Sequence, residues 1–259
     1  MNIIALLTDF GYKDGFVGAM KGVIKTINPS VEVIDISHDI SPFSILEASL
    51  ILYSTYKYFP KNTIFVCVVD PGVGTNRKPL IVHTENYFFV LPDNGLITLV
   101  LKEEKVRSIY EITNRQFMLR RISQTFHGRD IFAPVSAYIS VGVPLNLFGK
   151  KISIKEIKLL NFPEPKVKNG EIVGEILYFD RFGNAITNIP YKYLPENFII
   201  SFRNFKINKL SQNFLEGEKN QPNAIIGSTG LLELFLPEEN FKEKFLAKKG
   251  EKIIIQEEK

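Results

Sequence analysis

A short apolar run that ends abruptly at an aspartate constrains the fold of this chain more than any other feature. The run, Ile64 to Val69, has the length and β-branched content of a strand buried on both faces, and Asp70-Pro71-Gly72 follows it directly. In open α/β sheets, ligands bind beyond the carboxyl ends of such strands, where a glycine-rich loop lets the backbone approach them. Arg77 follows the turn, so its guanidinium could face the same crevice as Asp70. A Pro-Gly turn with a weak surface salt bridge explains the stretch equally well.

The segments before this run predict the first part of a parallel sheet. Apolar strands over 3–7 and 31–36 flank a helix over 16–27, whose apolar side chains recur at helical spacing. Ser41-Pro42 offers an N-cap followed by proline at the first helical position, which predicts a second helix that continues to about Tyr58. Two strand–helix units followed by a third apolar strand favour a parallel sheet covered on both faces.

The remainder of the chain predicts additions to this sheet and then a second domain. We expect a hairpin formed by 80–82 and 87–91, a short helix over 96–101, a strand over 106–112 and a helix over 131–141 capped by Asp130. The segment 161–165 contains two prolines and reads as a linker. Beyond it, short strand-like runs without helical periodicity predict a small β-barrel or sandwich. The expected fold is therefore α/β, with an N-terminal α/β domain over 1–160 that has a mostly parallel central sheet, and a smaller β domain over 170–259.

Composition and patterning exclude several classes of protein. No run of eighteen apolar residues occurs and the start lacks a basic leader, which predicts a cytoplasmic protein without a membrane partner. The single cysteine, Cys67, lies in the apolar strand, so a disulfide framework and a thiolate metal cluster are excluded. The net charge of +4 is spread over interleaved Lys and Glu, which indicates a solvated surface and no nucleic-acid partner.

Loop acids and one histidine are the candidate chemical groups of the first domain. Five aspartates occupy predicted loops and could bind a hard cation or sugar hydroxyls, although loop aspartates are also common helix caps: Asp9, Asp14, Asp39, Asp70 and Asp93. His127 stands before Gly128 and Arg129 at a predicted helix start, where its ring could shuttle a proton. We interpret His38 and His83 as structural. The histidines lack a zinc spacing, and the glycines form neither dinucleotide-binding nor P-loop motifs.

Two glycine turns are the candidate sites of the second domain. The segment 180–188, DRFGNAITN, places an aromatic ring, amides and a carboxylate around a turn, a combination that can stack on and read a heterocycle. A tight β-turn with a buried phenylalanine is the alternative. The segment 227–230, GSTG, could be a plain hairpin or a backbone pocket for a carboxylate.

Six segments, taken in order, resemble the S-adenosyl-L-methionine hydroxide adenosyltransferases, relatives of the fluorinases and chlorinases. They span nearly the whole chain: TDFGYKDGFVGAMKG from Thr8, VVDPGVGTNR from Val68, LPDNGL from Leu91, FHGRDIFAP from Phe126, DRFGNAITNI from Asp180 and GSTGLLEL from Gly227. The resemblance implies an N-terminal α/β domain, a C-terminal β-barrel and a homotrimer with sites between subunits. It also implies hydrolysis of S-adenosyl-L-methionine at C5′ of the ribose, giving adenosine and L-methionine, without a metal or a cofactor.

The resemblance further implies which residues form the site. The family's catalytic set falls on Asp70, Arg77 and His127, where a carboxylate and an imidazole would orient water and take its proton, and the guanidinium would favour developing hydroxide. It places Asp9 and Asp14 near the ribose and the nucleophile, Asp180 near the methionine amino group, Asn184 at adenine and Ser228 near the methionine carboxylate. The remaining substrate-binding positions are Phe43, Phe182 and Glu233.

Two positions depart from the halogenating relatives, and they leave alternatives open. Phe43 stands where the fluorinases have a tryptophan, and Thr229 where they have a carboxylate-contacting arginine, which weakens the inferred methionine clamp. The intact set Asp70, Arg77 and His127 and the short Thr84 to Tyr87 turn favour a hydrolase over a halogenase that forms 5′-chloroadenosine. A non-catalytic sensor of S-adenosyl-L-methionine or adenosine, and a metal-dependent hydrolase built on the aspartates, are the other readings.

Overall fold

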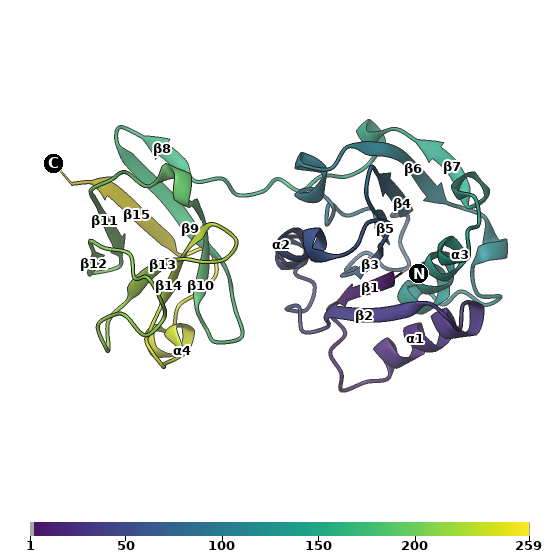
Figure 1. The fold of residues 1–259 in the computed structure, drawn as a ribbon, viewed down its shortest axis with the longest axis horizontal. Coiled ribbons are helices and arrows are strands. Elements are labelled where there is room, and N and C mark those ends of the chain that lie inside the picture. Colours follow the sequence, from purple (N-terminus) through teal and green to yellow (C-terminus); the bar gives the residue numbers. More distant parts are fainter. Residues whose placement is uncertain (1–2, 259) are drawn as a thin grey trace. The chain divides into compact units, whose positions relative to one another are not determined.

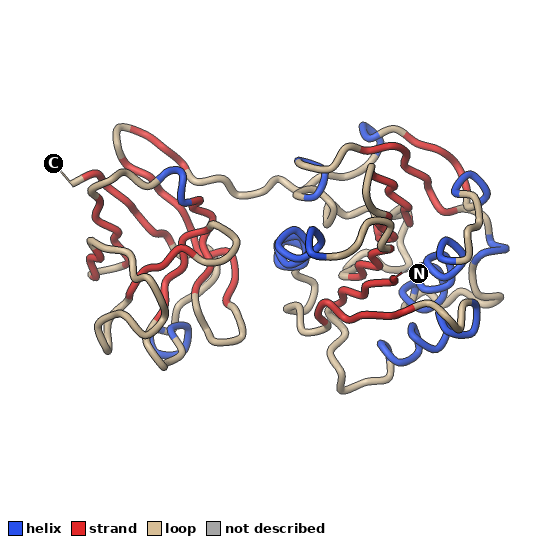
Figure 2. The backbone as a smooth tube through the Cα atoms, viewed as in Figure 1, coloured by secondary structure: helices blue, strands red, loops and turns tan. Residues whose placement is uncertain are grey.

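The structure is a computed structural model that describes residues 3–258 and divides into two units, residues 1–161 and 162–259. Figure 1 traces the chain through both units, and Figure 2 separates the helices from the strands. The first unit is a mixed α/β fold and the second is built almost wholly of strands. The predicted α/β fold class with a smaller barrel-like unit is confirmed. Among the described residues, no helix has the length and apolar character needed to cross a membrane.

The first unit contains a seven-stranded sheet in the order β2-β1-β3-β5-β4-β6-β7. β2, β1, β3 and β5 run parallel, and β4, β6 and β7 add antiparallel pairs. The strands are β1 (Ile3–Thr8), β2 (Glu32–Ser37), β3 (Ile64–Val68), β4 (Pro79–Thr84), β5 (Phe88–Pro92), β6 (Val106–Ile112) and β7 (Gly149–Ile152). All five residues of β3 are buried, because a strand inside a parallel sheet is covered on both faces. This burial explains the continuous apolar sequence of β3.

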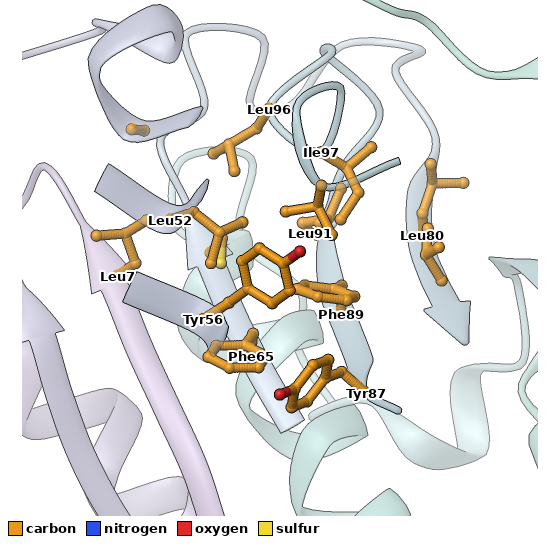
Figure 3. Close-up of a cluster of buried hydrophobic side chains, with 14 of the residues drawn as sticks. Leu7, Leu52, Tyr56, Phe65, Leu80, Tyr87, Phe89, Leu91, Leu96 and Ile97 are labelled. Carbon is orange, nitrogen blue, oxygen red and sulfur yellow. The ribbon is translucent and has the colours of Figure 1, made fainter. Parts of the chain in front are cut away.

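Helices cover both faces of this sheet. The helices are α1 (Phe16–Ile27), α2 (Ile45–Thr55) and α3 (Ala133–Ser140). Leu7 and Phe65 pack with Leu52 of α2 and with the aromatic rings Tyr56 and Phe89 (Figure 3). The alternate residues of β1 and β3 pack instead with α1 and α3 in a second core. β1 and β3 therefore lie between two helical layers, and the loops that follow them emerge at the edge between these layers.

Two predicted helix starts are wrong, and both errors lie beside the candidate site. α2 begins at Ile45 and not at Ser41-Pro42, because Phe43 adopts a left-handed backbone with φ 66° that a helix cannot include. Asp130 does not cap the third helix; it lies inside a π-helical turn, Gly128–Phe132, that leads into α3. The predicted helix over 96–101 is a turn followed by a 3₁₀ segment, Val100–Lys102.

The second unit is a barrel-like antiparallel sheet in the order β12-β11-β15-β9-β10-β14-β13, with β8 added to β9. Its strands are β8 (Lys166–Lys168), β9 (Glu171–Phe179), β10 (Ala185–Pro190), β11 (Phe198–Phe202), β12 (Phe205–Ile207), β13 (Asn223–Ile226), β14 (Leu231–Phe235) and β15 (Lys252–Glu257). Two elements were not predicted from the sequence: β10, which continues a segment interpreted only as a turn, and the short helix α4 (Phe241–Phe245). Ile176, Leu232, Leu234 and Ile253 contribute to the apolar core of this unit.

Candidate active site

Asp70, Arg77 and His127 form one continuous buried contact chain in the first unit. Arg77 Nε lies 3.1 and 2.9 Å from the two carboxylate oxygens of Asp70, and its Nη2 lies 2.5 Å from Oδ2. The same Nη2 lies 2.7 Å from Nδ1 of His127. The side chains of Asp70 and Arg77 are each only 5% exposed. The structure therefore brings together the three residues that the sequence predicts as catalytic.

The loop after β3 and the π-helical turn place these groups. Gly74 has φ 76°, and a Cβ there would lie 2.3 Å from the backbone oxygen of Gln124, so only glycine lets the two loops approach so closely. Asp130 orders the second loop: its carboxylate accepts the backbone N–H of Ser123 at 2.8 Å and pairs with Arg129 at 2.6 Å. π-helical turns are often found at functional sites, and this one carries His127 at its start.

The contact with Arg77 determines the protonation of His127. A guanidinium has only donors, so Nδ1 of His127 must accept the hydrogen bond and the proton of the neutral ring is on Nε2. Burial lowers the pKa of His127 and the positive charge of Arg77 lowers it further, against the opposing effects of Asp70, of Asp130 and of a hydrogen bond to the Ser123 backbone. The ring is therefore neutral at neutral pH and presents an N–H donor.

A cavity of about 270 Å³ lies against this contact chain. Asp70 and His127 line it together with Asp9, whereas Arg77 is not among its lining residues and supports the other two from behind. The rings of Phe10, Phe16 and Phe126 meet with centroids 5.1 to 5.8 Å apart and give the cavity an aromatic wall, and Pro42, Phe43, Val68, Val73, Thr125 and Gly128 complete it. Water or a small polar reactant would thus meet two acids and an imidazole in an otherwise apolar space.

Asp9 connects this cavity to the unusual backbone of Phe43. Oδ2 of Asp9 accepts the backbone N–H of Phe43 at 2.8 Å, which helps to hold Phe43 in its left-handed conformation. Burial raises the pKa of Asp9, and the nearby charge of Asp70 adds to this effect, while the Phe43 N–H opposes it. The Phe43 ring is 70% exposed and lines the cavity. Both residues were predicted to bind substrate, although this link between them has no signal in the sequence.

The other aspartates do not join this group. Asp14 is exposed on the loop before α1 and is not among the residues that line the cavity. Asp39 is exposed, and Asp93 is buried and accepts the backbone N–H of Lys158 at 2.7 Å. Within residues 3–258, no three His, Cys, Asp or Glu side chains are grouped so that they could hold a metal ion.

His38 and His83 have their own structural contacts. His38 is 1% exposed; its Nδ1 lies 2.7 Å from the hydroxyl of Thr8 and its Nε2 lies 3.1 Å from Asp35. His83 stacks on Phe88 with centroids 4.4 Å apart, and burial lowers its pKa. Since Thr8 directly precedes Asp9, the His38 contacts fix the end of β1 that carries Asp9.

The second unit has a larger cavity of about 690 Å³. Five of the predicted substrate-binding residues line it: Asp180, Phe182, Asn184, Ser228 and Glu233. The other residues of this wall were not predicted from the sequence, because they lie outside the two glycine turns: Phe214, Ile226, Leu236, Glu238, Glu239 and Asn240. Thr229 is exposed and is not among the lining residues.

Asp180 organises the turn that carries Asn184. Its Oδ1 accepts the backbone N–H groups of Phe182 and Asn184 at 2.9 and 2.8 Å, and its Oδ2 accepts the side-chain amide of Asn184 at 2.9 Å. The turn thus fixes the Asn184 side chain on the wall of the cavity. Phe182 is 74% exposed, so the interpretation of this turn as one with a buried phenylalanine is wrong.

Comparisons with known proteins agree with the two-unit fold. Residues 4–149 match the SAM hydroxide adenosyltransferase N-terminal domain, and residues 174–254 match the C-terminal domain of the same family. An (R)-S-adenosyl-L-methionine hydrolase from Methanocaldococcus jannaschii is 36% identical over 90% of this chain and 88% of its own length. A fluorinase from Actinoplanes is 29% identical over 72% of this chain and 71% of its own length.

A solved structure extends this agreement to the whole backbone. The crystal structure of an uncharacterized conserved protein from Thermotoga maritima is 38% identical, covers 98% of this chain and 99% of its own, and superimposes with a TM-score of 0.88. The family resemblance predicted from the six motifs is confirmed. The chain belongs to the SAM hydroxide adenosyltransferase family.

Proposed function

We propose that this protein is an enzyme that hydrolyses S-adenosyl-L-methionine at C5′ of the ribose, forming adenosine and L-methionine. The relatives named (R)-S-adenosyl-L-methionine hydrolases, which match most of this chain, support the reaction. The observation that carries the mechanism is the contact chain Asp70–Arg77–His127 beside a cavity with an aromatic wall. A protein that only binds its ligand has no need for a buried acid and imidazole held by one guanidinium.

The chemistry requires an activated water more than an activated leaving group. The sulfonium already carries a positive charge and departs as the neutral thioether of methionine when the C5′–S bond breaks. A water oxygen forms the new C5′–O bond and gives up one proton, so that substrate and water yield adenosine, methionine and H⁺. In-line attack needs the water oxygen and C5′ about 3–3.5 Å apart.

The residues divide this task. Asp70 takes the water proton, because it is the carboxylate of the contact chain that lines the cavity. In this proposal the Nε2–H of His127, which also approaches the Ser123 backbone, donates to the water oxygen and orients it, since Nδ1 is occupied by Arg77. Arg77 holds both partners and its charge favours the developing hydroxide. The family resemblance implied that Asp70 and His127 both take part in removing the proton; the hydrogen-bond pattern supports the carboxylate alone.

The two cavities hold complementary recognition groups. In this proposal Asp9 and Asp14 contact the ribose region and Phe43 packs beside it. The second unit supplies Asp180, Phe182, Asn184, Ser228 and Glu233 for the adenine and methionine ends. The complete site joins the first unit of one subunit to the second unit of a neighbour in a cytoplasmic homotrimer, and it uses neither metal nor cofactor.

Turnover in ¹⁸O-water tests the proposed reaction directly. Purified protein incubated with S-adenosyl-L-methionine should release adenosine above the spontaneous rate, with the label in its 5′-hydroxyl. The rate should be unchanged after exhaustive EDTA treatment, because no metal takes part. Binding without release would support a sensor, and 5′-chloroadenosine formed with chloride in preference to adenosine would support a halogenase.

A further inference from the structure

Glu233 is a buried carboxyl group without a side-chain partner on the wall of the 690 Å³ cavity. It is 8% exposed, and none of the hydrogen bonds or ion pairs among the described residues involves its side chain. A buried ionisable group left without a partner costs folding free energy, so such a group is a functional candidate. Glu233 is one of the proposed substrate-binding residues, and the part of the substrate that it contacts follows from its surroundings.

The strand pattern of β14 turns Glu233 away from the barrel core. Leu232 and Leu234 on either side pack into the core, so the side chain between them stands on the opposite face. Glu233 pairs with Ile186 of β10, and Asn184 lies two residues before Ile186 on the same face. A Cβ at Gly227 would lie 1.7 Å from Oε1 of Glu233, so glycine there makes room for the carboxyl group.

The surroundings of Glu233 favour its neutral form. Burial, and then the charge of Asp180, raise the pKa of Glu233 to about 7. Two further acids line the cavity, but each has a lysine nearby: Glu239 lies 2.9 Å from Lys244 and Glu238 lies 3.8 Å from Lys219. Asp180 accepts three N–H donors within its own turn.

A protonated carboxyl group offers one acceptor and one donor side by side. This pattern matches an edge of adenine, where the 6-amino group donates and a neighbouring ring nitrogen accepts. Phe182 and Phe214 on the same wall offer faces on which a flat base can stack. An ammonium group would instead require the charged carboxylate.

We propose that Glu233, in its protonated form, pairs with the adenine of the substrate through the 6-amino group and an adjacent ring nitrogen and so selects adenine nucleosides. This inference rests on the proposed function, because it concerns recognition of the same substrate. The expected consequence is that adenosine binding weakens when Glu233 loses its proton. A glutamine side chain is always neutral and also offers an acceptor and a donor side by side. Glu233→Gln should therefore preserve adenosine binding.

The test is calorimetric binding of adenosine and purine riboside to the full chain between pH 6 and 8.5. Wild-type affinity for adenosine should fall by roughly 10- to 30-fold over this range, as the protonated fraction falls. Glu233→Gln should bind adenosine within about threefold of wild type at pH 6, without that pH dependence, and Glu233→Leu should bind it roughly 10- to 100-fold more weakly. Preference over purine riboside, which lacks the amino group, should disappear in Glu233→Leu.

Loss of the pH dependence in Glu233→Gln would assign the titration to Glu233 and not to another group. This result can be obtained even if Glu233→Leu does not fold. Glu196→Gln, an exposed residue of the same unit, is the matched control and should keep the wild-type pH dependence. Affinity that rises with pH, or a Gln variant as weak as the Leu variant, would overturn the inference in favour of a charged carboxylate facing a cation. An adenosine affinity that is the same in the wild type and in every Glu233 variant would also overturn the inference.

Turnover measured in parallel separates this inference from the proposed function. If the wild type hydrolyses S-adenosyl-L-methionine but adenosine binding does not follow the Glu233 pattern, the inference alone fails. If the Glu233 pattern is present without hydrolysis, the inference stands as adenine recognition and the proposed function fails. Absence of both adenosine binding and hydrolysis overturns both.

Discussion

Nη2 of Arg77 lies 2.7 Å from Nδ1 of His127, although 50 residues separate them in the sequence. Because arginine can only donate, this one contact assigns the neutral His127 ring its proton on Nε2. It also places the guanidinium charge beside a ring that burial already keeps from ionising. The mechanism proposed above depends on this tautomer.

Arg77→Met should raise the pKa of His127. Burial remains and still lowers the pKa, but the repulsion between the guanidinium and a protonated ring is removed while Asp70 stays. Two-dimensional ¹H–¹⁵N spectra of the histidine rings should show the Nε2–H tautomer in the wild type and a higher titration midpoint in the variant. Arg107→Met is the control, since its charge acts on His83 and should leave the midpoint of His127 unchanged. A wild-type ring protonated on Nδ1 would contradict the assigned tautomer.

Asp70→Asn should lower kcat by about 10²- to 10⁴-fold, because the amide cannot take a proton from water. KM should change little, since most substrate contacts belong to other residues. His127→Gln, which keeps an N–H donor, should retain more activity than His127→Ala. The double variant Asp70→Asn/His127→Ala should lose less than the product of the single losses, as expected for residues that act as a unit. Steady-state kinetics with Asp39→Asn as an exposed-aspartate control check this; equal losses in the Gln and Ala variants would argue that His127 acts as the base.

Gly74→Ala should reduce turnover as well as stability. The new Cβ would meet the backbone oxygen of Gln124 at 2.3 Å and push apart the loops that carry Arg77 and His127, at a cost of about 1–3 kcal/mol. Gly142→Ala is the matched control. Gly142 also has a positive φ of 88°, but no atom lies within 4 Å of the position that its Cβ would take. That variant should lower the unfolding free energy by about 1 kcal/mol while kcat is unchanged. Thermal unfolding and kcat measured on both variants separate backbone strain from displacement of the site.

Asp35→Asn should destabilise the protein at neutral pH and much less in acid. Burial alone would raise the pKa of Asp35, but its contacts with Lys21, His38 and Tyr12 outweigh burial and lower it. An acid with a lowered folded-state pKa contributes stability above its unfolded value, about 3.8, and loses it as the pH falls through the folded value. We therefore expect a difference from wild type of about 1–2 kcal/mol in unfolding free energy at pH 7 that shrinks below about pH 4. Denaturant unfolding at both pH values measures it; a difference that is the same at pH 7 and pH 3 would contradict the linkage.

Mixing two inactive variants should restore activity if the proposed shared site is correct. Asp70→Ala removes a group of the first unit and Asn184→Ala a group of the second, so hybrid assemblies contain some sites with both groups intact. Activity after denaturant-assisted subunit exchange, compared with each variant treated alone, is the measurement. If mass spectrometry demonstrates subunit exchange but activity does not recover, the site lies within one chain.

The sequence alone determined the class of fold and the identity of the central residues. The apolar side chains of the β-branched run before Asp70 point to both faces of a strand. Both faces must be buried to remove them from water, which requires a sheet covered by helices. The six motifs carried the family resemblance, and with it Asp70, Arg77 and His127. These features are local, or depend on the order of residues along the chain, and so they can be read from one sequence.

Only the tertiary structure decided how these residues act. The left-handed Phe43 and the π-helical turn before α3 overrode the capping signals at Ser41 and Asp130. Asp9, 34 residues away, accepts the Phe43 N–H, and Asp130 accepts the backbone N–H of Ser123 in the preceding loop and does not cap α3. The tautomer of His127 follows from a donor 50 residues away. The state of Glu233 follows from burial and from the charge of Asp180. Hydrogen-bond direction and desolvation depend on which atoms meet in space, and the spacing of residues along a chain does not specify that.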